Sequence, residues 1–198
     1  MSEQVHTLAR PARHEVTIRK SRFLAQAAPV AGEADAAEFI ASVSDASANH
    51  NCWAWRLGQQ YRFSDDGEPG GSAGKPILMA IEGQGLDGVV VVVTRWFGGI
   101  KLGVGGLVRA YGGTAAECLR LADQVEVIDM ATVRFRLGYA EVELLKARMQ
   151  TWPSKTLQED FGAAAVTMTL SLARDRIEAL RSLLADLSRG QCDLHLID

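Results

Sequence analysis

The sequence predicts an α+β fold in two parts, an N-terminal α/β domain and a C-terminal β-α-β-β-α-β domain. The first part, residues 14–123, combines short strands and helices with glycine-rich loops, and its valine run at 89–94 is typical of a central strand buried on both faces. The second part, residues 124–198, lacks such loops and follows the ferredoxin-like order. A length of 198 residues, 47% of them hydrophobic, is enough for two small cores.

The first half of the N-terminal domain is predicted to be a small sheet with one helix. Residues 1–13 are interpreted as a flexible leader. Apolar alternation predicts strands at 14–19 and 23–30, and apolar residues at helical spacing predict a helix at 33–43. Two further strands are expected around a turn at Gly58, at 52–57 and 60–63.

The second half is predicted to place two helices beside the valine strand. One is expected from Ser72 to about residue 82, and the other from about 105 to 122, after a loop at 97–103. Gly112 and Gly113 fall inside the second helix and cost up to roughly 1 kcal/mol each against alanine. Their presence indicates that something packs closely on that face, and we expect it to be the sheet.

The C-terminal part is predicted to form one antiparallel sheet with both helices on the same face. The expected strands are 125–139, 156–161, 164–172 and 191–197, and the expected helices are 141–150 and 174–187. Because no cluster of acids and bases is evident there, we interpret this part as an accessory that contacts protein or RNA.

Composition excludes several classes of protein. The net charge is −3 and neither part is basic, so the chain does not bind nucleic acid through bulk charge and carries no DNA-specific signal. No apolar run approaches the ~20 residues of a membrane span. Cys52, Cys118 and Cys192 are few and far apart, which favours a reduced, cytoplasmic compartment and predicts no zinc site. We expect no metal and no cofactor, and the oligomeric state stays open.

The glycine-rich loop at 67–76 nearly matches a phosphate-binding loop but departs from it at two positions. That motif needs glycine where Pro69 stands and Ser or Thr where Pro76 stands, so nucleotide hydrolysis of that type is excluded. Ser72 is a candidate N-cap and Lys75 lies in the first helical turn, which makes the helix start a candidate anion site. An ordinary capped helix with a solvated lysine is an equal alternative.

The loop at 95–109 repeats this construction on a larger scale, although it lacks the third glycine of a dinucleotide fingerprint. A buried strand is followed by glycines that expose the backbone, then by a helix with basic residues around its start. Two such loops predict a surface that accepts an anion, phosphate or carboxylate. The residues assigned to it are Arg56, Lys75, Arg95, Gly98, Gly99, Lys101, Gly105, Gly106 and Arg109.

A second set of polar residues, His50, Asp65, Asp66 and Glu68, is a candidate acid–base or cation site. Asp-Gly is also typical of a tight turn, and a turn with salt bridges to Arg56, Arg62 or Lys75 is the favoured interpretation. His50 shares one strand face with Cys52, where a buried cysteine is favoured over a nucleophile. Trp53 and Trp55 share the opposite face, where core packing is favoured over base stacking.

Six stretches between residues 20 and 111 resemble one known family, the IMPACT family, whose bacterial members are the YigZ-type proteins. They are KSRFLA at 20–25, NHNCWAWR at 49–56, SDDGEP at 64–69, AGKPIL at 73–78, VVVTRWFGGIKLG at 91–103 and GGLVRAY at 105–111. The resemblance implies a first domain similar to domain IV of elongation factor G and to RNase PH, and a second similar to the small C-terminal module of the bacterial members.

The resemblance also bears on function. Eukaryotic relatives are implicated in the control of translation initiation, largely through an additional N-terminal domain that we do not expect here. We therefore expect a non-enzymatic, cytoplasmic binding protein with a translation-related role, whose partner is RNA, the ribosome or a translation factor. The alternative is an enzyme that acts on a small phosphorylated or carboxylated substrate at the same site, with no catalytic residue assigned.

Overall fold

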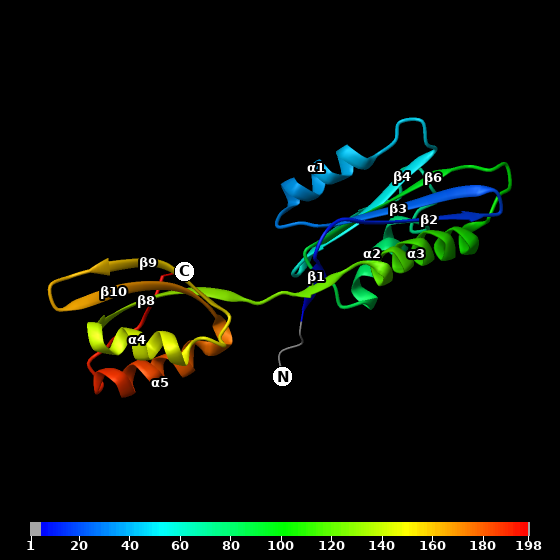
Figure 1. Cartoon of the computed structure of the whole chain (residues 1–198). Helices are drawn as coiled ribbons and strands as arrows, with labels where there is room; N and C mark the ends of the chain where they lie inside the picture. The colour runs from blue at the N-terminus through cyan, green and yellow to red at the C-terminus, as the bar shows by residue number, and fades with distance from the viewer. Residues whose placement is uncertain (1–4, 198) are drawn as a thin grey trace. The chain divides into compact units, whose positions relative to one another are not determined.

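The computed structural model describes residues 5–197 and divides the chain into two compact units, one ending at Val127 and the other beginning at Ile128 (Figure 1). The division therefore lies at 127/128 rather than at the predicted 123/124. Within the described residues, no helix is both long enough and apolar enough to cross a membrane.

A two-stranded ribbon at the start of unit 1 accounts for the later boundary. β1 (His6–Leu8) pairs antiparallel with β7 (Gln124–Glu126). Leu8 is 2% exposed in the core, and β2 begins at Ala12. The flexible leader expected at 1–13 is thus wrong for most of its length, while residues 1–4 lie outside the described residues. No local pattern reveals this pairing, because the two strands come from opposite ends of the unit.

Unit 1 is built on a five-stranded antiparallel sheet in the order β2-β3-β6-β4-β5. The strands are β2 (Ala12–Ile18), β3 (Ser21–Pro29), β4 (His50–Leu57), β5 (Gln60–Ser64) and β6 (Val89–Trp96). All the strands predicted in this part are confirmed. β4 starts two residues earlier than expected and β6 ends two residues later, so His50 and Arg95 lie on strands and face each other across the ladder.

Helices cover both faces of this sheet (Figure 1). α1 (Glu33–Val43) lies on one face, whereas α2 (Gly74–Gly83) and α3 (Val104–Leu121) lie on the other. The central strand β6 is buried on both sides, as predicted, because Val91 and Val93 pack toward α2 and α3 while Val90 packs toward α1. Trp53 and Trp55 belong to the α1-side core, which confirms the packing interpretation for them.

The glycine pair in α3 has a different neighbour from the one expected. A Cβ at Gly112 would lie 3.4 Å from Pro76 of α2, whereas a Cβ at Gly113 would have nothing within 4 Å. The close approach is therefore between two helices rather than between a helix and the sheet.

Unit 2 has the predicted β-α-β-β-α-β order, with a four-stranded antiparallel sheet in the order β11-β8-β10-β9. Side chains alternate along β8, where Val133, Phe135 and Leu137 are buried with the helices and the residues between them are not. The elements are β8 (Met130–Gly138), α4 (Tyr139–Arg148), β9 (Ser154–Phe161), β10 (Ala165–Ala173), a short 3₁₀ turn η1 (Arg174–Arg176), α5 (Ile177–Ser188) and β11 (His195–Leu196).

Two strand predictions in this part need correction. The strand expected at 125–139 is two strands, of which β7 belongs to unit 1. The strand expected at 191–197 is only His195–Leu196, so within residues 5–197 no strand lies beside the β8 edge beyond Arg134.

Leu8→Ala tests whether the start of the chain is part of the core. We expect the free energy of unfolding of unit 1 to fall by about 2–5 kcal/mol, because a buried leucine leaves a cavity when it is truncated. Urea unfolding followed by tryptophan fluorescence measures this, since Trp53, Trp55 and Trp96 all lie in unit 1. Val5→Ala, at a position 36% exposed, is the matched control and should change little. Equal stability of the two variants would restore the flexible-leader interpretation.

Candidate functional site

The candidate site forms where β3, β6 and β4 present a row of side chains toward α3. Arg95 of β6 is opposite Phe23 of β3 and His50 of β4 in the antiparallel ladders. Directly opposite residues point to the same face of a sheet, so these three side chains project together. The alternation of buried valines in β6 identifies that face as the one covered by α2 and α3.

Glu68, in the turn after β5, places its buried carboxylate beside this row of side chains. Its Oε1 accepts a hydrogen bond from Arg95 Nη1 at 2.6 Å and another from the Tyr111 hydroxyl of α3, also at 2.6 Å. The side chains of Glu68 and Arg95 are 4% and 6% exposed. Burial, followed by the nearby Cys52 and Glu68, raises the pKa of Tyr111 far above its usual value, so the phenol stays protonated and donates.

His50 lies beside this carboxylate with its tautomer fixed. Its Nδ1 is 2.7 Å from the backbone carbonyl oxygen of Asp66, which only accepts hydrogen bonds, so Nδ1 carries the hydrogen. Its Nε2 is 3.7 Å from Glu68 Oε1. Cys52 is a buried structural residue, as favoured: its thiol donates to the Asp65 carbonyl, and burial raises its pKa to about 12.

A cavity of about 470 Å³ opens above these groups. It is bounded by the N-terminus of α3 at Gly103 and Val104 and by the loop that precedes that helix. Of the residues predicted to form a site, the structure brings together His50, Glu68, Arg95 and Lys101. The remaining lining residues are mostly apolar: Pro69, Phe97, Leu102, Val104 and Leu107, together with Asn49 and Gly103. We call this cavity the α3 pocket.

The N-terminus of α2 is not an anion site, because a carboxylate of the chain already occupies it. Asp65 Oδ1 accepts hydrogen bonds from the backbone N–H groups of Ala73 and Gly74, and Oδ2 accepts one from Gly71. Burial acts to raise the pKa of Asp65, but these three hydrogen bonds outweigh it and hold the pKa below its usual value. Ser72 is therefore not the cap. Its hydroxyl donates to the Pro69 carbonyl instead.

The N-terminus of α3 differs from that of α2. Its N-cap is Gly103, at φ 71°, and no side chain of the described residues caps it. Its first turn holds no acidic residue. Val104, the first residue of α3, lines the α3 pocket beside Lys101, so the positive end of the helix dipole lies at this pocket without a carboxylate from the described residues bonded to it.

Several predicted site residues lie elsewhere. Arg56 is at the far end of β4, opposite Val89, and bonds the Gly58 carbonyl. Lys75 is exposed on α2 and does not line the α3 pocket. Arg109 lines a separate cavity of about 280 Å³. The described residues contain no group of three or more His, Cys, Asp or Glu side chains able to hold a metal ion.

The glycines predicted to form the site, two in the loop before α3 and two in its first turn, mainly determine the path of the backbone. A Cβ at Gly98 would lie 2.0 Å from the Lys20 backbone, so only glycine fits against that turn. Gly99 adopts φ +85°, a left-handed conformation that favours glycine. Gly106 packs on Leu102, whereas Gly105 is exposed in the first turn of α3. Gly99 and Gly105 are the exposed glycines of this set, and neither lines the α3 pocket.

Sequence reasoning missed Tyr111 and Phe97 as site residues. Tyr111 falls in the apolar line of α3, and nothing in the local sequence shows that its hydroxyl meets Glu68. Phe97 is 46% exposed on the wall of the α3 pocket, immediately before the Gly98–Gly99 pair. An aromatic residue beside a glycine-rich basic loop was the available signal for it.

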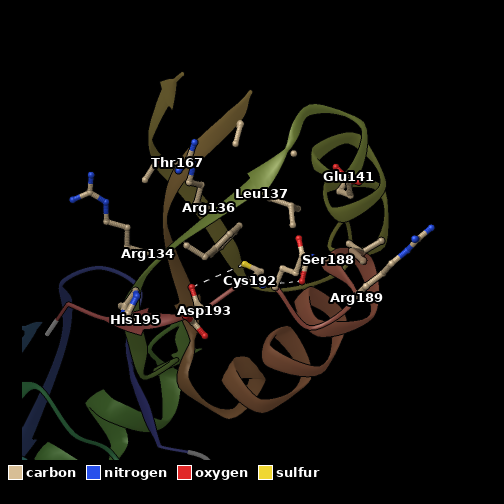
Figure 2. Close-up of a pocket in the computed structure, with 15 residues that line it drawn as sticks. Arg134, Arg136, Leu137, Glu141, Thr167, Ser188, Arg189, Cys192, Asp193 and His195 are labelled. Atoms are coloured by element: carbon tan, nitrogen blue, oxygen red, sulfur yellow. Dashed lines mark hydrogen bonds between the residues drawn. The ribbon is translucent and has the colours of Figure 1, made fainter. Parts of the chain in front are cut away.

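Unit 2 contains a larger cavity, of about 710 Å³, along the edge of β8 that the short β11 leaves uncovered (Figure 2). Arg134, Arg136 and Arg189 line it, so this part is not without grouped charges, contrary to expectation. These arginines lie at the surface, and Arg134 is also 3.8 Å from Asp160. Solvent screens such groups. We therefore place the candidate site at the α3 pocket, where the charged residues Glu68 and Arg95 are buried.

Comparison with known proteins identifies the family. Residues 19–119 match the Impact N-terminal domain, and residues 135–191 match a Domain of unknown function (DUF1949). The chain is 36% identical over 188 residues to the IMPACT family member YigZ of Escherichia coli, covering 91% of this chain and 92% of that protein. This chain belongs to the IMPACT family. An IMPACT family member of Thermus thermophilus is 56% identical over 135 residues, which are 66% of this chain and 75% of that protein.

A solved relative confirms the fold. The crystal structure of a hypothetical protein, 34% identical, aligns with a TM-score of 0.70 over 100% of this chain and 99% of that chain. Every residue that lines the α3 pocket falls within the part of the chain that matches the Impact N-terminal domain.

Arg95→Met tests the buried ion pair. We expect the free energy of unfolding to fall by about 3–5 kcal/mol, because Glu68 would remain as a buried charge without its partner. Adding Glu68→Met should recover part of this loss, since both charges are then removed. The control is Arg62→Met, which breaks an exposed pair with Glu33 and should cost only about 0–1 kcal/mol. Additive effects of the two site mutations in denaturant unfolding would show that the pair is not coupled.

Proposed function

We propose that this IMPACT family protein is a cytoplasmic, non-enzymatic binding protein with a translation-related role, and that it contacts RNA through a phosphate group held in the α3 pocket. One observation carries the proposal. The N-terminus of α3 opens on a pocket beside Lys101 with no carboxylate of the described residues to cap it, whereas α2 has Asp65 in the same position. A helix N-terminus with free N–H groups and an adjacent lysine is favourable for phosphate.

The surface that supports this proposal is narrower than the one the sequence predicted. Of five basic residues, only Arg95 and Lys101 line the α3 pocket, and Glu68 neutralises Arg95. Only Lys101 and the helix dipole then remain to attract an anion there. With a net charge of −3 there is little long-range attraction, so recognition depends on this one pocket. Binding should therefore depend only weakly on salt concentration, as expected for very few phosphate contacts.

The translation-related part of the proposal rests on family membership. The chain matches the Impact N-terminal domain over residues 19–119, which contain the whole α3 pocket. Two cysteines in this stretch, Cys52 and Cys118, are buried free thiols, which is compatible with a reducing compartment.

An enzyme acting on a small phosphorylated or carboxylated substrate is the second candidate, and the geometry of His50 favours it. With Nδ1–H donated to Asp66, a neutral His50 has a lone pair on Nε2, next to Glu68 in the wall of the α3 pocket. A base held in this way is suited to proton transfer. Thermal-shift screening of a metabolite library, followed by product analysis for any stabilising anion, distinguishes the two. Turnover that is abolished by His50→Gln would replace the binding proposal.

Lys101→Glu tests the binding proposal against a matched control, Lys75→Glu. Both lysines are exposed and lie near helix N-termini, but only Lys101 lines the α3 pocket. We expect Lys101→Glu to weaken binding of a short single-stranded RNA phosphorylated at both ends by about tenfold or more. The slope of log K against log salt concentration should fall by about 0.7, because the ammonium group that neutralises one phosphate is removed.

Fluorescence anisotropy at several salt concentrations measures both quantities. Lys75→Glu should leave them close to the wild-type values, because Asp65 fills the N-terminus of α2. Equal affinities for wild type and Lys101→Glu would refute the proposal.

A further inference from the structure

Two arginines of unit 1, Arg19 and Arg109, have no hydrogen-bond or ion-pair partner among the described residues, and both line the same cavity. Every other arginine of this unit pairs with a carboxylate or, in the case of Arg56, bonds a backbone carbonyl. The cavity, of about 280 Å³, lies between the turn that joins β2 to β3 and the first turns of α3. Its other lining residues are Ile18, Leu102, Gly106 and Ala110. We call it the two-arginine cavity.

The segments around the two-arginine cavity supply no carboxylate to neutralise these cations. The only acidic residues in β2, β3, α3 and the loop at 97–103 are Glu15 and Glu117. Glu15 is bonded to Arg22, and Glu117 is bonded to Arg120. Two positive charges therefore line one cavity without a negative charge beside them. Because like charges repel, this arrangement is less favourable without an anion than with one.

The backbone at the edge of the two-arginine cavity is strained, which is an independent observation. Arg19 and Lys20 form the two-residue turn between β2 and β3, and their φ angles are 46° and 68°. Hairpin turns with positive φ at both central residues favour Asn-Gly, since a β-carbon in this conformation costs free energy. Gly98 packs so closely on this turn that a β-carbon there would overlap the Lys20 backbone. The fold thus keeps an arginine at the cavity edge where the backbone favours another residue, and such strain clusters at binding sites.

We propose that the two-arginine cavity binds one phosphate group, held between the guanidinium groups of Arg19 and Arg109. A planar carboxylate is matched by a single guanidinium fork, whereas the oxygens of a phosphate point in several directions and can accept from two forks together. The volume is below the roughly 300 Å³ at which pockets for whole ligands begin, so the cavity suits one group of a ligand. The site is separate from the α3 pocket, and the inference goes beyond the proposed function without resting on it.

The absence of acidic lining residues distinguishes this cavity from the larger one in unit 2. There, Glu141 and Asp193 line the cavity together with the arginines, and Arg134 lies 3.8 Å from Asp160. Acidic groups of this kind oppose the binding of an anion. The residues that line the two-arginine cavity are basic or apolar apart from Gly106. Apolar walls also weaken the solvent screening that makes exposed charges ineffective.

The phosphate can belong to an RNA strand or to a free phosphorylated small molecule, because both present the same group. Leu102 lines the two-arginine cavity and the α3 pocket, so the two cavities are neighbours. A strand that reaches both would contact them through different phosphates. The experiment therefore uses inorganic phosphate to test the site itself and a short single-stranded RNA to identify the source.

The first test follows the arginine Nε–H signals of the full chain by NMR during titration with inorganic phosphate at constant ionic strength. We expect the signals of Arg19 and Arg109 to shift together with one dissociation constant, because they bind the same ion. The signal of Arg120, which is paired with Glu117, should stay in place. Acetate in place of phosphate should cause much smaller shifts. Equal shifts of all arginine signals, or no shift at Arg19 and Arg109, would overturn the inference.

The second test compares Arg19→Asn and Arg109→Gln with a matched control, Arg120→Gln, which removes the same charge from α3 outside the cavity. Each cavity variant should weaken phosphate binding by about tenfold or more, and the control should not. Arg19→Asn should melt no lower than wild type, because asparagine tolerates positive φ, so its loss of binding is not a loss of folding. Phosphate affinity equal to wild type in both cavity variants would refute the site.

The same variants identify the source of the phosphate by anisotropy with the short RNA. If RNA binding also weakens by about tenfold in the cavity variants, the strand supplies the phosphate. If RNA binding is unchanged while phosphate binding is lost, the source is a free phosphorylated molecule, and the site stands in either case. Because Lys101 does not line the two-arginine cavity, Lys101→Glu should leave the phosphate titration close to wild type. Failure of the proposed function and failure of this inference are thus distinguishable.

Discussion

The buried carboxylate of Glu68 is the constraint on which the rest of unit 1 depends. One oxygen atom accepts from Arg95 on β6 and from Tyr111 on α3, and Glu68 itself comes from the turn after β5. A buried charge is tolerated only when it is paired and hydrogen-bonded, so these three segments must keep their mutual positions. The edge-on packing of Phe23 against Tyr111, with ring centroids 5.3 Å apart, adds β3 to the same assembly. The inner end of the α3 pocket is therefore rigid before any ligand binds.

The N-termini of α2 and α3 show how one physical principle serves structure in one place and leaves a candidate site in another. Free N–H groups and the dipole favour negative charge at both. At α2 the favourable anion is Asp65, which fixes the turn that also presents Glu68. At α3 the preceding loop supplies Lys101 instead of a carboxylate, and its glycines serve the path of the chain. Within the glycine-rich region, the start of α2 is therefore part of the scaffold, whereas the start of α3 lines the pocket.

The class of fold, most of the elements and the stretch of chain that holds the candidate site could be predicted from the residues alone. Periodicity is a local property, so the valine strand, the helices on either side of it and the order of elements in unit 2 all follow from the pattern. The pairing of β1 with β7 could not be predicted, because a short strand with a distant partner leaves no periodic signal. The shortening of β11 was also missed, since tertiary contacts rather than propensity determine where an edge strand ends.

For the candidate site, the sequence shows which residue types are unusual, and the folded chain determines which of them meet. His50, Glu68, Arg95 and Lys101 come together because strand register and one buried ion pair bring them there. Arg56 and Lys75 have the same chemistry but lie at a far strand end and beside an N-terminus that the chain has already capped. The hydroxyl of Tyr111 is indistinguishable from part of an apolar helix face until its partner is seen. Hydrogen bonds between distant segments depend on positions in space, and a linear pattern of residue types does not contain those positions.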